Sequence, residues 1–329
     1  MPIDLLTTTV AAGRNTAPAA ARCLAAGGLV AFPTETVYGL GADATNADAI
    51  ARLYLAKGRP SFNPLIAHVS SLAAAQKIAL FSAESRKLAE AFWPGPLTLV
   101  LLKTENCPVS ELATAGLETI AVRVPAHPVA RDILEAFGKP IVAHSANLSG
   151  HVSPTTAQHV RDDLTGRIDL IVDGGPVDVG VESTIVGCFD KPVLLRPGGL
   201  PRADIERILG VSLAEIAPEN NETDQAHPLA PGMLASHYAP RTPVRLKADH
   251  LEPGEVLLAF GPALSSADPR RVLNLSARGD LVEAAANLFS HLRLLDSKDA
   301  RAIAVMPIPD DGLGEAINDR LRRAAVQRD

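Results

Sequence analysis

Helix-type and strand-type patterns alternate along roughly the first 200 residues, and this order constrains the fold more than any other feature of the sequence. An alanine-rich helix pattern at Thr16–Ala26 leads directly into the apolar run Leu29–Phe32. The alternation continues with a helix at Asn46–Lys57, capped by Asn46, a strand at Leu65–Val69 and a helix at Ala83–Phe92. Because such mixtures pack as helices on a sheet, we expect an α/β domain with one twisted, partly parallel sheet.

Further short apolar runs between turn residues add strands to this sheet. They are apolar throughout, which is typical of strands buried on both faces. The last of them lie close together in the chain and favour antiparallel additions. The runs are Leu97–Leu102, Ile120–Val124, Ile141–Ala143, Leu170–Val172, Thr184–Val186 and Val193–Leu195.

A proline-rich stretch divides the chain. Ala217–Pro243 holds five prolines and many polar residues without periodicity, a composition typical of a linker. Beyond it, Val256–Phe260 and Ile303–Val305 predict strands, and Leu281–Leu295 and Glu315–Ala325 predict helices. The predicted organisation is a larger domain at 10–215, a linker at 216–243 and a smaller α/β domain at 244–329.

Composition and charge exclude several classes of protein. The 329 residues are 47% hydrophobic and 21% charged, as in ordinary globular proteins, and no apolar run reaches the roughly 18 residues of a membrane-spanning helix. A formal net charge of -6 argues against an extended basic face for a polynucleotide, but not against a local anion pocket. Three widely spaced cysteines, Cys23, Cys107 and Cys188, predict neither a disulfide framework nor a zinc site. Residues 1–10 lack an export signal, so we expect a cytoplasmic protein.

Gly39–Ala44 fits the GxGxxA pattern of a dinucleotide-binding turn. The acidic residue expected about 20 positions later is missing, because that region reads Gly58–Asn63. We therefore expect these glycines to form a tight turn. No P-loop pattern occurs either, so a nucleotide must be held in another way.

Two polar clusters follow predicted elements. Lys57–Pro60 closes a helix pattern, where cations complement the helix dipole, and Lys57 is expected at an exposed helix end. His144–Gly150 comes straight after a buried strand, where ligands usually bind in α/β sheets and small polar groups approach phosphate closely. A simple Asx or serine turn explains the second cluster equally well.

Arg123 lies inside the apolar run Ala121–Pro125. A buried guanidinium needs an anionic partner. Two explanations stay open, capture of a substrate carboxylate and a structural salt bridge to an acid of the protein. Similar polar breaks in apolar runs occur at Phe32–Gly39, Gly180–Ile185 and Leu195–Gly198.

Together these segments resemble the Sua5/YrdC family. Seven motifs occur in the family's order, and the segment Pro231–Pro240 resembles the one that distinguishes the two-domain Sua5 type from the single-domain YrdC type. The resemblance covers nearly the whole chain. The motifs are FPTETVYGLGAD (Phe32–Asp43), AKGRP with NPL (Ala56–Leu65), WPGPLT (Trp93–Thr98), AVRVPAHP (Ala121–Pro128), SANLSG (Ser145–Gly150), GVESTI (Gly180–Ile185) and LLRPG (Leu194–Gly198).

The resemblance implies a YrdC-like domain, a twisted mixed sheet with helices, followed by a smaller Rossmann-like α/β Sua5 domain. It implies an L-threonylcarbamoyladenylate synthase, which condenses L-threonine, bicarbonate or CO2 and ATP to threonylcarbamoyl-AMP and pyrophosphate for the threonylcarbamoyl-adenosine modification of tRNA. Mg2+ would accompany ATP, with no metal held by the protein itself. The product would pass to the tRNA threonylcarbamoyl transferase complex, and we expect a monomer that does not contact a membrane.

The resemblance also implies residue roles at the nucleotide site. Lys57 and Arg59 would supply positive charge for adenylyl transfer. Tyr238 resembles the residue that folds back over the nucleotide, so that the linker would act as a lid that excludes water. The implied nucleotide-binding tetrad is Lys57, Arg59, Ser145 and Asn147, and the further ATP contacts are Asn63, Thr119, Ser153, Arg196 and Tyr238.

The threonine site is implied in the same way. Arg123 would pair the amino-acid carboxylate by a bidentate fork. The family usually has proline or threonine before the SAN triplet, whereas this chain has His144, which either alters a local pKa or fills the pocket edge. The residues implied for threonine or its carbamate are Thr34, His68, Arg123, the backbone at Ala143, and Ser183.

Two other functions stay open at this point. One is a non-catalytic RNA-binding module of the same fold, which strong salt dependence of RNA binding would favour. The other is an enzyme that carbamoylates a different small amine, which would be indifferent to removal of threonine's hydroxyl.

Overall fold

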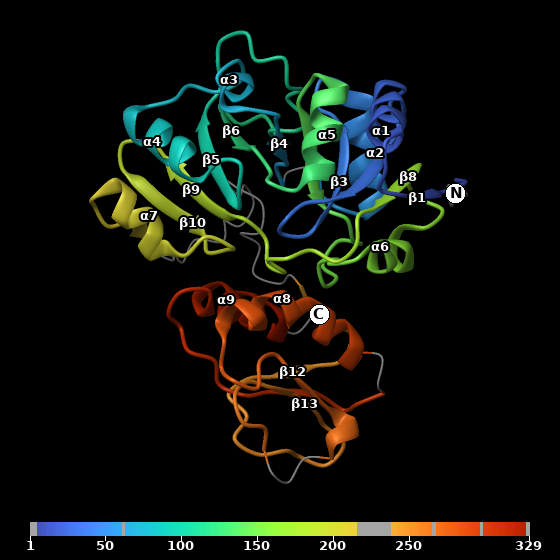
Figure 1. Ribbon diagram of the computed structural model, residues 1–329, viewed down its shortest axis with the longest axis vertical. Coiled ribbons are helices and arrows are strands. Elements are labelled where there is room, and N and C mark those ends of the chain that lie inside the picture. Colours follow the sequence, from blue (N-terminus) through green and yellow to red (C-terminus); the bar gives the residue numbers. More distant parts are fainter. Residues whose placement is uncertain (1–4, 61–62, 216–237, 265–267, 297–298, 327–329) are drawn as a thin grey trace.

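The computed structural model describes residues 5–60, 63–215, 238–264, 268–296 and 299–326. Figure 1 shows a larger lobe, coloured blue to yellow, above a smaller one in orange and red. Each lobe is built on its own sheet and carries helices. The predicted α/β class is therefore confirmed for both.

The larger lobe contains an 11-stranded sheet. In sheet order the strands are β1 (Thr8–Ala11), β8 (Leu170–Asp173), β2 (Val30–Pro33), β3 (Tyr38–Asp43), β7 (Ile141–Ser145), β4 (Ile66–His68), β6 (Thr119–Arg123), β5 (Leu97–Leu102), β9 (Thr184–Cys188), β10 (Pro192–Arg196) and β11 (Ala214–Glu215). Antiparallel pairing joins β2 to β3, β3 to β7, β7 to β4, β6 to β5 and β9 to β10. The other neighbours are parallel, so the sheet is mixed, and its late strands β9 and β10 are antiparallel as expected.

Helices cover both faces of this sheet. They are α1 (Thr16–Ala25), α2 (Ala47–Lys57), α3 (Leu72–Ala75), α4 (Ala83–Phe92), α5 (Pro128–Phe137), α6 (Ala157–Leu164) and α7 (Arg202–Leu209). On one face, α1 and α5 pack together through residues such as Leu24 and Ile133. On the other, α2, α4 and α6 bury Leu53, Leu88 and Val160 in a larger core. This two-sided cover explains why the strand sequences are apolar throughout.

The expected tight turn at Gly39–Ala44 is wrong, because most of this segment forms β3, a strand inside the sheet. A Cβ atom at Gly41 would come within 2.7 Å of Ile141 and of Phe32. Glycine is therefore needed there because neighbouring side chains approach the strand closely.

The smaller lobe contains a parallel sheet with the order β12 (Val244–Arg245), β15 (Ile303–Val305), β13 (Val256–Ala259) and β14 (Val272–Asn274). Its helices are α8 (Leu281–Asp296), α9 (Gly314–Ala325) and the short 3-10 helix η2 (Pro269–Arg271). Figure 1 shows α8 and α9 between this sheet and the larger lobe. The two long helices therefore form the side of the smaller lobe that faces the larger one.

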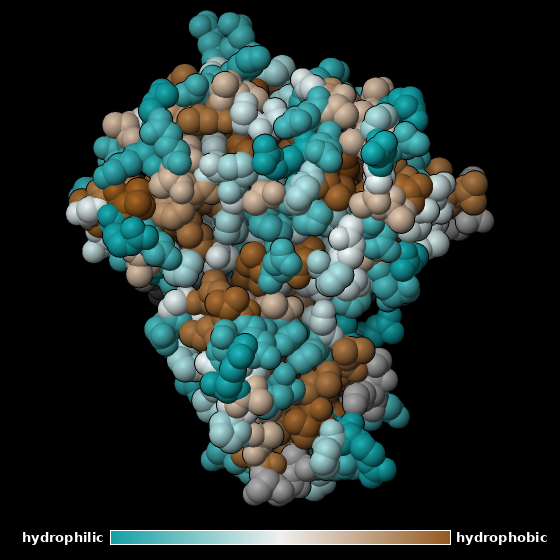
Figure 2. All heavy atoms as spheres, viewed as in Figure 1, coloured by the Kyte–Doolittle hydropathy of each residue, from teal (hydrophilic) through white to brown (hydrophobic). Residues whose placement is uncertain are grey.

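The two lobes share a packed core. Val37 and Val181 of the larger lobe lie in one apolar cluster with Phe289 of α8, and Figure 2 shows hydrophobic side chains gathered where the lobes meet. Gly180 has φ +79°, and a Cβ atom there would lie 2.3 Å from the backbone oxygen of Ala285. Only glycine allows the chain to pass so close to α8 in this conformation.

The predicted domain boundaries fall between the two sheets. β11 ends at Glu215 and β12 begins at Val244, while β1 already begins at Thr8, before the predicted start at residue 10. Residues 216–237 of the predicted linker lie outside the described residues, so its role as a lid stays a prediction. The start predicted at residue 10 falls inside β1, which pairs with β8 from Thr8 onward. We therefore propose a larger domain that begins at Thr8 and ends at residue 215, a linker at 216–243 and a smaller domain at 244–329.

Candidate active site

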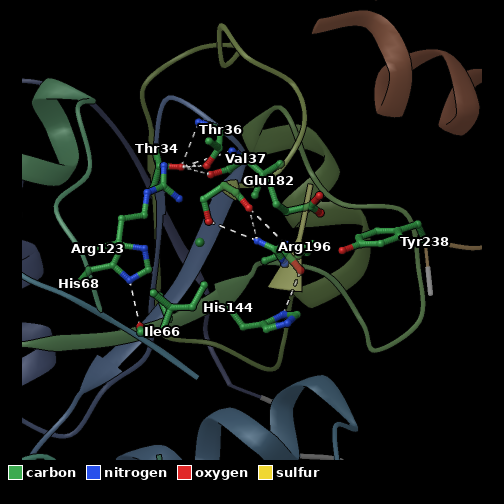
Figure 3. A pocket seen from close by; sticks show the side chains of 14 residues that line it. Thr34, Thr36, Val37, Ile66, His68, Arg123, His144, Glu182, Arg196 and Tyr238 are labelled. Carbon is green, nitrogen blue, oxygen red and sulfur yellow. Dashed lines mark hydrogen bonds between the residues drawn. The ribbon is translucent and has the colours of Figure 1, made fainter. Parts of the chain in front are cut away.

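A pocket lies beside strand ends of the large sheet, with Tyr238 in its lining (Figure 3). Tyr238 begins the described segment 238–264, which leads into the smaller lobe. Its empty volume is about 430 Å³, including space open to solvent. Side chains come from the β2–β3 turn, from β4 and β7, and from the ends of β6 and β10. The lining residues are Thr34, Thr36, Val37, Gly39, Ile66, His68, Arg123, Ala143, His144, Ser145, Glu182, Ser183, Arg196 and Tyr238.

The residues predicted to hold threonine all line this pocket; they are Thr34, His68, Arg123, Ala143 and Ser183. Two of them present hydroxyls whose positions are fixed by other protein groups. Thr34 Oγ1 lies 2.8 Å from Thr36 Oγ1. Ser183 Oγ lies 2.8 Å from Thr98 Oγ1 and accepts a hydrogen bond from Arg196 Nη2 at 3.2 Å. Such fixed hydroxyls orient a polar ligand without further ordering.

Arg123 has an acid of the protein as its partner. Its Nη2 donates to Glu35 Oε1 at 2.6 Å, and its Nε donates to the Gly95 oxygen at 3.3 Å. Burial pushes the pKa of the Glu35 carboxyl upward, but Arg123, together with backbone hydrogen bonds such as that from the Ala126 amide, more than offsets this and holds that pKa below its usual value. A structural salt bridge, one of the two explanations left open by the sequence, is therefore present. Nη1 makes no hydrogen bond to the described residues, which leaves it for a further anion.

His68 is buried in the pocket wall, with Nδ1 3.1 Å from the Ile66 oxygen. Burial, reinforced by the nearby charge of Arg123, lowers the pKa of His68 to about 3. The imidazole is therefore neutral near pH 7 and meets a ligand as a hydrogen-bonding group, not as a cation.

The burial of His68 predicts a pH dependence of stability. The unfolded chain protonates this histidine below about pH 6.5, whereas the folded chain keeps it neutral down to about 3. The unfolded state thus binds more protons in this window, so the free energy of unfolding decreases as the pH is lowered through it. In urea titrations, His68→Gln should lose less unfolding free energy than the wild type between about pH 7.5 and about pH 5. His250→Gln, at a side chain 68% exposed, should keep the wild-type dependence. Equal losses in the wild type and His68→Gln would contradict this account.

The expectation that Lys57 lies at an exposed helix end is wrong. Lys57 is the last residue of α2, but it is only 1% exposed. The end of β7 and the residues after it fold over the helix terminus, and Lys57 Nζ donates to the backbone oxygens of Ser145, at 2.5 Å, and of Asn147. Burial and the charge of Arg59 lower the pKa of Lys57 well below its usual value. Lys57 therefore links the Ser145–Asn147 segment to the end of α2. It is one hydrogen bond away from Ser145, which lines the pocket.

Buried polar atoms without partners gather among the predicted nucleotide residues. Arg59 is buried, and burial lowers its pKa to about 10. Its hydrogen bonds to described residues are long, at 3.5 and 3.4 Å, and go to the backbone oxygens of Asn63 and Pro64. Within the described residues, Arg59 Nε, both amide atoms of Asn63 and Oδ1 of Asn147 have no partner. Since buried polar atoms are normally hydrogen-bonded, this arrangement indicates a site for a polar ligand.

Two further predicted ATP residues lie around Glu182. Ser153 is fully buried and donates to Glu182 Oε1, which places it one hydrogen bond behind the pocket wall. Arg196 lines the pocket and donates to the backbone oxygen of Ser183 at 2.8 Å. Both side chains are thus held by the segment that precedes β9.

Tyr238 is 1% exposed and lies on the side of the pocket where Arg196 and Glu182 are found (Figure 3). Its ring stacks on Phe289 of α8, with centroids 5.6 Å apart and an interplanar angle of 24°. The guanidinium carbon of Arg320 lies 5.1 Å from the centroid of the Tyr238 ring. The smaller lobe therefore holds Tyr238 against the pocket.

Two predicted positions differ in their relation to the pocket. Thr119 begins β6, opposite Leu102 of β5. It is not among the lining residues, and its ATP contact stays a prediction, as do those of the other predicted ATP residues outside the lining, Lys57, Arg59, Asn63, Asn147 and Ser153. His144 lines the pocket, with Nδ1 3.0 Å from Ser145 Oγ. His144 thus fills the pocket edge, one of the two alternatives considered for it.

Sequence reasoning missed Glu35, Glu182 and Arg320. The two acids carried a signal, because each interrupts an apolar run beside hydroxyl residues, and a buried acid needs a cation. Arg320 carried none, since it lies on a polar helix close to Arg322 and Arg323. Its burial is visible only in the packing of the two lobes.

Within the described ranges, no three His, Cys, Asp or Glu side chains are grouped so that they could hold a metal ion. The same residues include no helix with the length and apolar character needed to cross a membrane.

The fold and pocket define a two-lobed α/β protein with a site for a small polar ligand, lined by two buried arginines, Arg123 and Arg196. The family model Sua5/YciO/YrdC, described as "Telomere recombination", matches residues 22–198, and the model "Threonylcarbamoyl-AMP synthase, C-terminal domain" matches residues 200–326. The chain therefore belongs to the Sua5/YrdC family, as the sequence predicts.

Curated relatives extend over nearly the whole chain. A threonylcarbamoyl-AMP synthase of Pyrococcus abyssi is 44% identical, with 92% of both chains covered. One of Bacillus subtilis is 43% identical, with 91% of this chain and 90% of the relative covered. The crystal structure of P. abyssi Sua5 complexed with L-threonine matches with a TM-score of 0.87 at 40% identity and covers 97% of both chains.

Proposed function

We propose that this chain is a threonylcarbamoyl-AMP synthase, which makes threonylcarbamoyl-adenylate from L-threonine, bicarbonate or CO2, and ATP for the threonylcarbamoyl-adenosine modification of tRNA. The observation that carries the proposal is the pair of buried cations Lys57 and Arg59, neither of which forms an ion pair with a described residue. A buried cation without a carboxylate partner is stabilised by an anionic ligand, and the triphosphate of ATP is such a ligand. Two relatives of this name, each with about nine-tenths of its length covered, support the same function.

The reaction divides into two bond-forming steps. The amine of threonine attacks the carbon of CO2, or of bicarbonate with loss of water, and becomes a carbamate. A carbamate oxygen then attacks the α-phosphorus of ATP, and the bond to the β-phosphate breaks as pyrophosphate leaves. Such transfer depends mainly on positioning and charge neutralisation. In our proposal Lys57 and Arg59 neutralise the phosphates, while Arg123 holds the threonine carboxylate between the hydroxyls of Thr34 and Ser183.

An enzyme that uses ATP also requires a divalent metal. Glu182, the acid in the pocket lining, already accepts hydrogen bonds from Ser153 and Arg320, whereas the phosphates of ATP are themselves ligands of Mg2+. We propose that Mg2+ enters bound to the phosphates of ATP. The same proposal includes a monomeric enzyme that hands its product to a transferase. The cytoplasmic location stays a prediction.

Pyrophosphate release by the purified chain tests the proposed function. We expect release only when ATP, threonine and bicarbonate are all present, because the carbamate is the nucleophile. Serine, which lacks the methyl group but keeps the hydroxyl, should support slower release, and 2-aminobutyrate, which lacks the hydroxyl, should support much less.

Omitting threonine, or replacing it with 2-aminobutyrate, distinguishes the proposed function from the other functions considered. Release without threonine would contradict the proposal and indicate another adenylating activity. Equal release with 2-aminobutyrate would indicate an enzyme for a different amine. No release, together with RNA binding that weakens steeply with salt, would favour the binding module.

A further inference from the structure

Arg320 of α9 is a fully buried arginine between the lobes, with 0% of its surface exposed. Its Nε donates to Glu182 Oε2 at 2.8 Å, across 138 residues of sequence, and its Nη1 donates to Asp319 Oδ2 at 2.5 Å. Its guanidinium carbon also lies 5.1 Å from the centroid of the Tyr238 ring. A side chain of the smaller lobe thus contacts two residues that line the pocket of the larger one.

Glu182 connects this arginine to the proposed ATP site. One carboxylate oxygen accepts from Arg320 and the other from Ser153. The next residue, Ser183, accepts hydrogen bonds from Arg196 through its backbone oxygen and its hydroxyl. The position of Glu182 therefore affects both Ser153 and the segment that holds Arg196.

The negative charge of Glu182 gives this connection an effect on ATP binding. Glu182 is the one acid among the described residues that line the pocket. Three predicted ATP residues, Ser145, Arg196 and Tyr238, belong to the same lining, and the ATP proposed to bind there carries several negative charges. A buried carboxylate without a cation is costly and repels an approaching phosphate. Arg320 supplies the compensating cation from the second lobe.

On the basis of the proposed function, we propose that Arg320 is a positioning residue of the active site. It acts through Glu182, which it neutralises and holds against Ser153, and through the ring of Tyr238. The smaller lobe thereby completes the ATP site, and ATP binding depends on the contact between the lobes.

Steady-state kinetics of four variants test this inference. Arg320→Gln should raise the KM for ATP about tenfold, with much smaller changes in the KM for threonine and in kcat. Arg320→Lys should recover part of the loss, because it keeps the charge but not the planar fork. The double variant Arg320→Gln with Glu182→Gln should bind ATP better than Arg320→Gln alone, because the uncompensated carboxylate is gone.

Arg202→Gln is the matched control. Arg202 of α7 pairs with Glu315 of α9 at 2.5 Å, so this variant removes another ion pair between the lobes, on the same helix, away from the pocket lining. It should leave the KM for ATP unchanged. Calorimetric binding of a non-hydrolysable ATP analogue to each variant should reproduce the order of the KM values without requiring turnover.

The outcomes separate the two proposals. If Arg320→Gln and Arg202→Gln change all constants alike, or if Glu182→Gln does not restore ATP binding to Arg320→Gln, Arg320 is structural only. If Arg320→Gln does not fold, Arg320→Lys and the double variant decide the question by the same comparison. A wild type that binds the analogue but releases no pyrophosphate with threonine and bicarbonate overturns the proposed function, while the binding data still test Arg320.

Discussion

Lys57→Ala should lose at least about 100-fold in the rate of threonylcarbamoyl-adenylate formation. The ammonium group is buried beside Arg59, and the proposed reaction builds up negative charge on the phosphates next to it. Removing it should also destabilise the fold by about 1–3 kcal/mol, since the backbone oxygens of Ser145 and Asn147 lose a donor. Pyrophosphate release and urea unfolding of the same preparation measure the two effects.

Two companion variants separate charge from packing. Lys57→Met keeps most of the side-chain volume, so it should lose activity as severely as Lys57→Ala while leaving a smaller cavity. Lys139→Ala removes a lysine that is 54% exposed and pairs with Asp43, and it should keep full activity. A folded Lys57→Met with normal turnover would exclude any role of this charge in the reaction.

Local signals in the sequence predicted much of the fold. Asn46 caps α2 by accepting hydrogen bonds from the amides of Asp48 and Ala49, as its residue type and position predict. The predicted bounds Ala83–Phe92, Leu97–Leu102 and Ile303–Val305 coincide with α4, β5 and β15. In each case residues adjacent in the chain decide the outcome.

Predictions were wrong or missing where contacts between segments far apart in the chain determine the structure and burial of a residue. The glycines of Gly39–Ala44 match a turn pattern, but contacts with β2 and β7 place them in a strand. Lys57 looks exposed on its own helix and is covered by residues about 90 positions later. The Glu182–Arg320 pair spans both domains. Nothing near any of these residues in the chain records its partner, so their burial could not be predicted from local pattern.

Arg123→Lys should raise the KM for threonine by about 10- to 100-fold, with a smaller effect on the KM for ATP. In the structure the guanidinium already uses Nη2 for Glu35 and Nε for the Gly95 oxygen, which leaves Nη1 for a substrate carboxylate. A lysine has a single nitrogen and cannot hold Glu35 and a carboxylate in the same geometry. The salt bridge and carboxylate capture are thus compatible in one side chain, because a guanidinium has several donors. Threonine titrations of pyrophosphate release measure the change.

Glu35→Gln tests the role of the salt bridge between Glu35 and Arg123. It keeps a hydrogen-bonding oxygen for Arg123 but removes the charge, so Arg123 becomes more available to a substrate anion while less firmly positioned. If Arg123 serves only the structural salt bridge, Arg123→Lys and Glu35→Gln should both lower stability and leave the KM for threonine unchanged. If Arg123 serves both the salt bridge and carboxylate capture, Arg123→Lys alone should raise the KM for threonine strongly. Arg131→Lys, at a helix arginine 46% exposed, should change neither quantity and controls for the substitution itself.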